Sequence, residues 1–312
     1  MTLTFRPPSH RLRIGIDLGG TKIAGVAIDE NEKVVKEVRT ASPRDDYKAT
    51  LTAITTVIDQ LHGGQCDDFS VGIGMPGSIA PNTNGVQNAN STWLNDRPLG
   101  ADLSQALARE VRLANDANCF ALSEATDGAA RDTSSVFGVI LGTGVGGGIV
   151  LDGRVWHGAD GVAGEWGHNP LPWAEPSEMP GEACYCGRRG CLETWLSGPA
   201  LARDHASRQA GPARMTPPEI VAAAGAGDAL AQTSLTLYVG RLARGLAHVV
   251  NLLDPQAIVL GGGLSNIPGL TEELTQRMEE WVFSDRLATR ILTHLHGDSS
   301  GVRGAAWLWP AT

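Results

Sequence analysis

A chain of 312 residues is long enough for two domains, and a content of 42% hydrophobic and 19% charged residues is typical of a globular protein. The net charge of −9 argues against a nucleic-acid partner, because binding to phosphate backbones requires a basic surface. No apolar run is long enough to cross a bilayer, and residues 1–13 lack the apolar segment of a secretory signal, so we expect a cytoplasmic protein with no membrane partner.

The first half of the chain predicts an α/β unit that opens on a hairpin. Residues 12–16 and 24–28 have the apolar content of strands, and the glycine turn Asp17-Leu-Gly-Gly-Thr-Lys22 separates them. A dinucleotide-binding unit would need a helix in place of the second strand. A third strand is predicted at 34–40, and apolar residues at helical spacing predict a helix over 47–61. The next predicted elements are strands at 71–75 and 111–114 and helices at 101–110 and 117–126.

The second half repeats the strand, glycine turn and strand of the first hairpin. A predicted strand at 135–141 leads into Gly142-Thr-Gly-Val-Gly-Gly-Gly148 and then into a second strand at 149–151. This repetition predicts two related α/β domains with a cleft between them, an N-terminal domain over 1–130 and a C-terminal domain over 131–299. The remaining predicted elements are helices within 217–253, a strand at 257–260, and helices at 270–282 and 301–309.

Three glycine-rich turns, each after a predicted strand, indicate nucleotide binding. They occupy residues 17–22, 142–148 and 261–265. Glycine amides can face phosphate oxygens, the hydroxyl of Thr21 adds a donor, and the carboxylate of Asp17 can hold Mg²⁺ through water. One such turn could be a simple hairpin turn, but three together favour a nucleotide site. The GxGxxG pattern in the second turn leads into a strand rather than a helix, which disfavours a dinucleotide.

The cysteine spacing predicts a structural zinc site. Cys184, Cys186 and Cys191 supply three thiolates within eight positions, and His168 lies upstream. Three cysteines and one histidine complete a closed tetrahedral zinc site, which leaves no position for a reacting water. A redox pair and buried free thiols are the alternatives, and the one-residue gap with a third cysteine nearby favours zinc. The sequence assigns no role to the other two cysteines, Cys66 and Cys119.

The stretch Asn115-Asp116-Ala-Asn118 lies between a predicted strand and a predicted helix. Phosphorylation of a hydroxyl needs a base that accepts its proton as the γ-phosphoryl group arrives, and a carboxylate at a strand end suits this role. The alternative is structural, because Asp116 could be the N-cap of a helix that starts near Ala117. The residues alone leave both roles open.

Together these motifs resemble the ROK family (repressors, open reading frames and kinases), and the likeness covers the chain after residue 12. The family's Glu-Gly-His and Cys-x-Cys-Gly-x-x-Gly-Cys-x-Glu motifs match Glu165-Trp-Gly-His168 and Cys184–Glu193, with Trp166 inserted. The resemblance implies an α/β, two-domain actin-like ATPase (ribonuclease H-like) fold with central mixed sheets and an interdomain cleft. It also implies a homodimer and a return of residues 300–312 to the N-terminal domain.

The resemblance also assigns roles to individual residues. It makes Asp116 the general base, Mg²⁺ near Asp17 the ion of phosphoryl transfer, and zinc on His168 and the three clustered cysteines a structural brace. The residues implied to contact the sugar are Gly77, Asn90, Asn115, Asp116, Glu165, His168 and Glu193. The residues implied to bind ATP are Asp17, Gly19, Gly20, Thr21, Lys22, Gly142, Thr143, Gly144, Gly261, Gly262 and Gly263.

Within the family, residues 88–95, 164–173 and 296–307 resemble bacterial fructokinases, including manno(fructo)kinases. We therefore expect ATP-dependent phosphorylation of D-fructose to fructose 6-phosphate, with mannose or glucose as further acceptors. N-acetylglucosamine kinases, which share residues 115–124 closely, are the alternative; Trp93 would fill the space that an acetamido group needs beside C2.

Two classes of nucleic-acid binder are also considered. A sugar-sensing ROK repressor needs a helix-turn-helix domain, and only about a dozen residues precede the first predicted strand. A zinc-ribbon protein would leave the three glycine turns unexplained. The acidic charge disfavours both classes.

Overall fold

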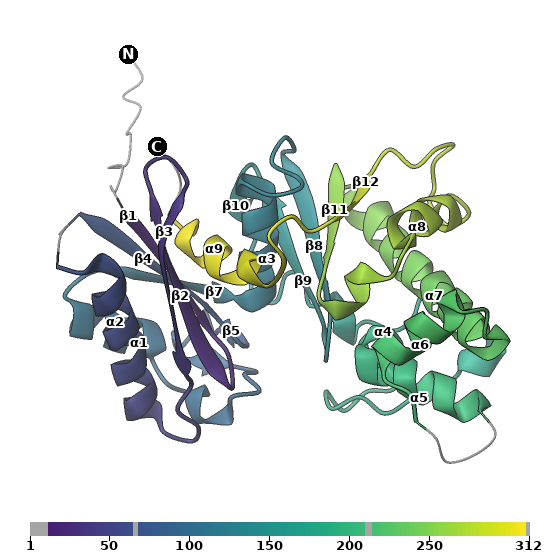
Figure 1. The fold of residues 1–312 in the computed structure, drawn as a ribbon, viewed down its shortest axis with the longest axis horizontal. Helices are drawn as coiled ribbons and strands as arrows, with labels where there is room; N and C mark the ends of the chain where they lie inside the picture. The colour runs from purple at the N-terminus through teal and green to yellow at the C-terminus, as the bar shows by residue number, and fades with distance from the viewer. Residues whose placement is uncertain (1–11, 65–67, 210–213, 310–312) are drawn as a thin grey trace. The chain divides into compact units, whose positions relative to one another are not determined.

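The computed structural model describes residues 12–64, 68–209 and 214–309, and its fold is drawn in Figure 1. Most of the N-terminal segment and Cys66 lie outside the described residues. The chain divides into two compact units. The first takes its described residues from Met1–Ser134, Gly148–Ala163 and Asp298–Thr312, and the second from Ser135–Gly147 and Gly164–Gly297. Over the described part of the chain, no helix has the length and apolar character needed to span a membrane.

The first unit is built on a mixed five-stranded sheet with the strand order β3-β2-β1-β4-β7. The predicted hairpin is confirmed, because β1 and β2 pair antiparallel and Leu18 lies opposite Ile23. β3 continues antiparallel to β2, whereas β4 and β7 extend the other side of the sheet in parallel. The strands are β1 (Leu12–Leu18), β2 (Lys22–Asp29), β3 (Val34–Ala41), β4 (Phe69–Met75) and β7 (Val111–Asn115).

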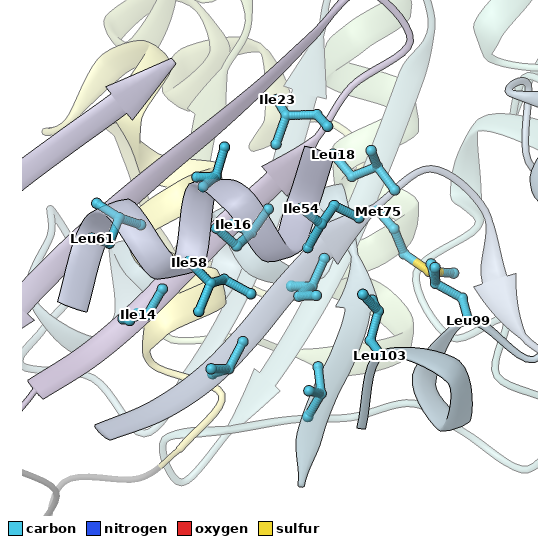
Figure 2. Close-up of a cluster of buried hydrophobic side chains, with 14 of the residues drawn as sticks. Ile14, Ile16, Leu18, Ile23, Ile54, Ile58, Leu61, Met75, Leu99 and Leu103 are labelled. Carbon is cyan, nitrogen blue, oxygen red and sulfur yellow. The ribbon is translucent and has the colours of Figure 1, made fainter. Parts of the chain in front are cut away.

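Helices α1 (Tyr47–His62) and α2 (Leu99–Leu107) contribute to the hydrophobic core of this sheet. The side chain of Asp46 caps α1 by accepting a hydrogen bond from the amide of Ala49. Figure 2 shows the apolar face of α1 directed at the strands, and α2 adds Leu99 and Leu103. Burial of each of these leucine side chains contributes about 1.5–3 kcal/mol to the free energy of unfolding.

The C-terminal helix α9 (Ser300–Ala306) packs on β1, β4 and α3 (Asp116–Thr126) without intervening side chains. A Cβ atom at Gly15 would lie 2.1 Å from the carbonyl oxygen of Val302, and one at Gly72 would lie 1.9 Å from that of Ala305. Glycine at these positions is therefore what allows α9 to approach the strands. A short hairpin, β5 (Ser78–Ile79) and β6 (Val86–Gln87), and the 3₁₀ turn η1 (Thr92–Leu94) complete this unit's loops near the end of β4.

A second five-stranded sheet has the order β10-β9-β8-β11-β12. β11, the fourth strand in this order, runs parallel to both β8 and β12. The strands are β8 (Ser135–Leu141), β9 (Val145–Leu151), β10 (Arg154–Val155), β11 (Ala257–Gly261) and β12 (Arg290–Thr293). The predicted strand at 149–151 begins four residues earlier, so the second glycine turn is shorter than the sequence indicated.

The α-helices of the second unit follow the last cysteine of the Cys-rich motif, Cys191, along the chain. They are α4 (Glu193–Leu196), α5 (Gly198–Arg208), α6 (Pro217–Gly225), α7 (Ala229–Leu253) and α8 (Leu270–Met278). Residues 148–163 fall within the first unit rather than with the rest of 131–299, because Gly148 packs against α3. A Cβ atom at Gly148 would lie 2.5 Å from the carbonyl oxygen of Ala117.

Candidate functional site

Three loops of the first unit meet around Gly77, directly after β4. Gly77 has a φ of +76°, and a Cβ atom there would lie 2.3 Å from the carbonyl oxygen of Gln87, so only glycine fits. Asn115, at the end of β7, donates a hydrogen bond of 2.9 Å from Nδ2 to the carbonyl oxygen of Gly77. The structure thus brings together two of the residues that the sequence assigned to the sugar.

Asp116 is the first residue of α3, and its N-cap is Asn115. The Oδ1 atom of Asn115 accepts a hydrogen bond of 2.9 Å from the amide of Ala117. The N-cap role that the sequence left open for Asp116 is therefore taken mainly by Asn115. Asp116 Oδ1 also lies 2.8 Å from the Ala117 amide. The carboxylate of Asp116 is exposed at the positive end of the helix dipole, where a negative charge is favoured.

The loop over residues 88–95 is held by Asn95, a residue that the sequence analysis did not single out. Its side chain accepts a hydrogen bond from the amide of Ala89 and donates one to the carbonyl of Ala89, at 2.9 and 3.1 Å. Asn90 is exposed within this loop. Trp93 packs against the core of the first unit and donates from Nε1 to the hydroxyl of Thr50 on α1, at 3.2 Å. These contacts direct the indole toward α1.

The first glycine loop (residues 17–22) is a tight turn closed by its own backbone. The amide of Gly19 donates to the carbonyl of Lys22 at 3.0 Å, and a Cβ atom at Gly20 would lie 3.5 Å from Ser91 Oγ. Burial raises the pKa of Asp17, and the charge of Lys22 acts in the opposite direction. A nearby cation stabilises the charged form of a carboxylate that is partly removed from water. The burial of Asp17 therefore fits the expected Mg²⁺.

The second glycine loop (residues 142–148) and the third (residues 261–265) leave neighbouring strands of the second unit. Because β8 and β11 run parallel, with Gly261 opposite Ile140, both loops emerge at the same end of the sheet. Gly262 has a φ of +81°, and a Cβ atom there would lie 2.5 Å from the carbonyl oxygen of Leu141. The structure therefore places two of the three predicted ATP-binding loops next to each other.

The predicted metal ligands converge in the second unit. One ligand atom from each of His168, Cys184, Cys186 and Cys191 lies within 4.8 Å of all the others. The Cys184 sulfur lies 3.5 Å from His168 Nδ1, and the sulfurs of Cys186 and Cys191 are 3.6 Å apart. Thiolates bound at about 2.3 Å in a tetrahedron are separated by about 3.8 Å. The donor set and spacing therefore fit zinc, with Nδ1 as the nitrogen that would bind it.

Tyr185, between the first two metal-ligand cysteines, contacts the opposite side of His168. Its hydroxyl lies 2.9 Å from His168 Nε2, and the two rings meet edge to face. Although the residue is largely exposed, local desolvation, followed by the charges of Glu193 and Glu165, raises the pKa of Tyr185 to about 12. The second unit thus gathers Glu165, His168 and Glu193 around this tyrosine. No local sequence pattern indicates a role for Tyr185, because only the folded motif turns it toward His168.

A buried ion-pair cluster attaches the segment that carries these residues to α7. Glu178 accepts a hydrogen bond of 2.8 Å from Arg241 Nε and two, of 2.8 and 2.9 Å, from Arg244 Nη2. Arg244 also donates to the carbonyl of Trp173, and the guanidinium of Arg241 lies 4.4 Å from the ring of Trp195. Burial alone would raise the pKa of Glu178, but the two arginines outweigh this effect and lower it to about 2.

Comparison with known proteins agrees with this geometry. Residues 13–312 match the model of the ROK family. The chain is 40% identical to an N-acetyl-D-glucosamine kinase of Escherichia coli O127:H6 over 298 residues, which cover 94% of this chain and 98% of the relative. The structure of a ROK hexokinase from Thermus thermophilus matches with a TM-score of 0.82 and 31% identity, covering 95% of this chain and 97% of that one.

A ROK family glucokinase from Streptomyces griseus, in complex with glucose and AMPPNP, matches with a TM-score of 0.74 and 29% identity, covering 95% of this chain and 98% of that one. The match to the family model and the similarity to the E. coli relative both extend over nearly all of the chain. The chain therefore belongs to the ROK family and is a sugar kinase with the actin-like ATPase fold of that family.

Proposed function

We propose that this kinase transfers the γ-phosphoryl group of ATP to a hydroxyl of N-acetylglucosamine. The observation that carries the proposal is the 40% identity, over 94% of the chain, to a kinase named for this sugar. From the sequence, N-acetylglucosamine is the alternative acceptor, because the indole of Trp93 could fill the space for an acetamido group. The contacts of Trp93 with Thr50 and the core of the first unit support this acceptor, because they hold the indole against α1.

In the proposed mechanism, Asp116 accepts the proton of the attacking hydroxyl. Its position at the end of β7 and the start of α3 exposes the carboxylate, and the cap formed by Asn115 fixes the backbone beneath it. Asn115 and Gly77 orient the sugar with Asn90, and Glu165, His168 and Glu193 bind further hydroxyls. The three glycine loops bind ATP, and Mg²⁺ near Asp17 supplies charge neutralisation for the phosphates when bound.

Zinc has a structural role in this proposal. Four protein ligands leave no open position on the metal, so zinc would shape the segment that carries Glu165 and Glu193 without reacting itself. His168 would bind zinc through Nδ1 and face the sugar with its other ring nitrogen.

Fructose is the second candidate acceptor. It is favoured by the resemblance of residues 88–95, 164–173 and 296–307 to fructokinase motifs. The decisive measurement is kcat/KM for N-acetylglucosamine, fructose, mannose and glucose at saturating ATP, followed as ADP release. We expect N-acetylglucosamine to lead by at least about tenfold, and a clear preference for fructose would reject it in favour of the second candidate.

A further inference from the structure

The second glycine loop is bonded to both ends of the segment over residues 165–193, here called the metal segment. At its C-terminal end, Glu193 accepts a hydrogen bond of 3.0 Å through Oε2 from the amide of Val145. At its N-terminal end, Trp166 donates from Nε1 to the carbonyl of Gly146 at 3.0 Å. A Cβ atom at Gly167 would lie 2.2 Å from the carbonyl oxygen of Val145, so the two backbones are in direct contact.

The contact at Glu193 leaves little room for adjustment. A Cβ atom at Gly144 would lie 2.6 Å from Glu193 Oε2, so glycine there is what allows the carboxylate to reach the next amide. The loop is also held just beyond Glu193, because the amide of Gly198 donates to the carbonyl of Gly142 at 2.8 Å. The loop predicted to bind ATP phosphates is therefore shaped by the residues that follow the last metal-ligand cysteine.

We infer that Glu193 is a positioning residue for ATP, and that its bond to Val145 couples the sugar and nucleotide sites of the second unit. This inference rests on the proposed function, in which Glu193 binds the sugar and residues 142–144 bind ATP. One carboxylate oxygen orders the glycine loop and the carboxylate charge binds the sugar. Any shift of Glu193 toward a bound sugar changes the conformation of the second glycine loop and so its affinity for ATP. By linkage, bound ATP must change the affinity for the sugar by the same factor.

The test measures AMPPNP binding by calorimetry without sugar and again with saturating N-acetylglucosamine. Glu193→Ala leaves the Val145 amide without its acceptor, so we expect AMPPNP to bind about tenfold more weakly even without sugar. Glu193→Gln keeps an oxygen that can accept this bond and should retain AMPPNP affinity within about threefold, while sugar binding weakens. Gly144→Ala should reproduce the loss by displacing the carboxylate.

Glu165→Ala is the matched control. Glu165 is the other carboxylate of the metal segment proposed to bind sugar, and among the described residues no hydrogen bond joins its side chain to the second glycine loop. Its loss should raise KM for the sugar alone, whereas Glu193→Ala should raise KM for both substrates. Zinc content and melting temperature establish that each variant is folded.

The outcomes separate the two proposals. If wild type binds AMPPNP and a folded Glu193→Ala variant binds it equally well, the link is overturned and the kinase proposal stands. If wild type neither binds AMPPNP nor releases ADP with any hexose, the proposed function itself fails.

Discussion

The two glycine loops that follow the first strands of the two sheets share a motif but are stabilised differently. Each loop contains a backbone bond of its own, from Gly19 to Lys22 in the first and from Gly142 to Gly144 in the second, and the amide of Ser42 also donates to the carbonyl of Thr21 in the first. Side chains from distant sequence hold the second loop as well, because Glu193 accepts from Val145 and Trp166 donates to Gly146. The second loop therefore depends on the Cys-rich segment in a way that the first does not. Substitutions in each unit should show how the two units differ in what stabilises them and in what they contribute to activity.

The largest expected effect lies in the first unit. Asp116→Asn removes the proposed base without changing the size of the side chain, so kcat should fall by about a thousandfold while AMPPNP affinity changes little. Steady-state kinetics and calorimetry on the same preparation measure both quantities. A variant that keeps more than a tenth of wild-type kcat would exclude Asp116 as the base.

Removal of a metal ligand should affect the second unit most. Cys186→Ser should reduce bound zinc from about one ion per chain to near zero and lower the melting temperature by roughly 10 °C, because binding of a structural metal is coupled to folding. Elemental analysis and thermal unfolding provide the readouts. Cys119→Ala, at a buried cysteine of the first unit, is the control that should keep zinc. Wild-type stability in a zinc-free Cys186→Ser variant would contradict the structural role.

The Glu178 cluster gives a pH-dependent prediction. The pKa of Glu178 is about 2 in the folded protein and about 4.3 in an unfolded chain, so its stabilisation is complete above about pH 4.3 and disappears as the pH falls toward 2. Glu178→Ala leaves the buried Arg244 without a carboxylate partner and Arg241 with Asp204 alone, and should cost about 3–5 kcal/mol at pH 7.

Urea unfolding at several pH values tests this role. The variant should show a weaker loss of stability than wild type between pH 4.3 and 2, since it lacks the titrating group. Parallel curves for the two proteins over that range would show that Glu178 does not contribute.

The smallest expected effect is that of Tyr185→Phe. The tyrosine is 82% exposed, so loss of its hydrogen bond to His168 should cost less than about 1 kcal/mol and raise KM for the sugar about twofold to threefold. Zinc content should not change. A fall in KM would instead indicate that the hydroxyl competes with the sugar for His168.

The sequence predicted the elements whose signals are local. The first hairpin and α1 were placed to within two residues, because strand residues around a glycine turn and a helical apolar stripe are short-range patterns. β12 was missed because its pairing with β11 comes from far along the chain, and Ile291 is its only buried residue. α5 was missed because it follows the Gly- and Cys-rich motif directly.

In the candidate site, too, local patterns could be predicted from the sequence and contacts between distant residues could not. The three cysteines of the candidate metal site could be named from spacing alone, since they lie within eight positions. The Val145–Glu193 bond and the Glu178–Arg244 pair join residues 48 and 66 positions apart, and no local pattern indicates them. The direction of the Trp93 indole, on which the choice between the two proposed acceptor sugars rested, is set by a contact with Thr50, 43 positions away, and no local pattern indicates it.

The packing of α9 has a consequence for synthesis on the ribosome. The glycines of β1 and β4 contact a helix that follows the whole second unit in the sequence, so this sheet is covered only after the second unit has been made. The second unit, whose residues end at Gly297, has all its strands before α9 emerges. We therefore expect the nascent first unit to remain incomplete until α9 has been synthesised, so removal of α9 should destabilise the sheet that contains β1 and β4.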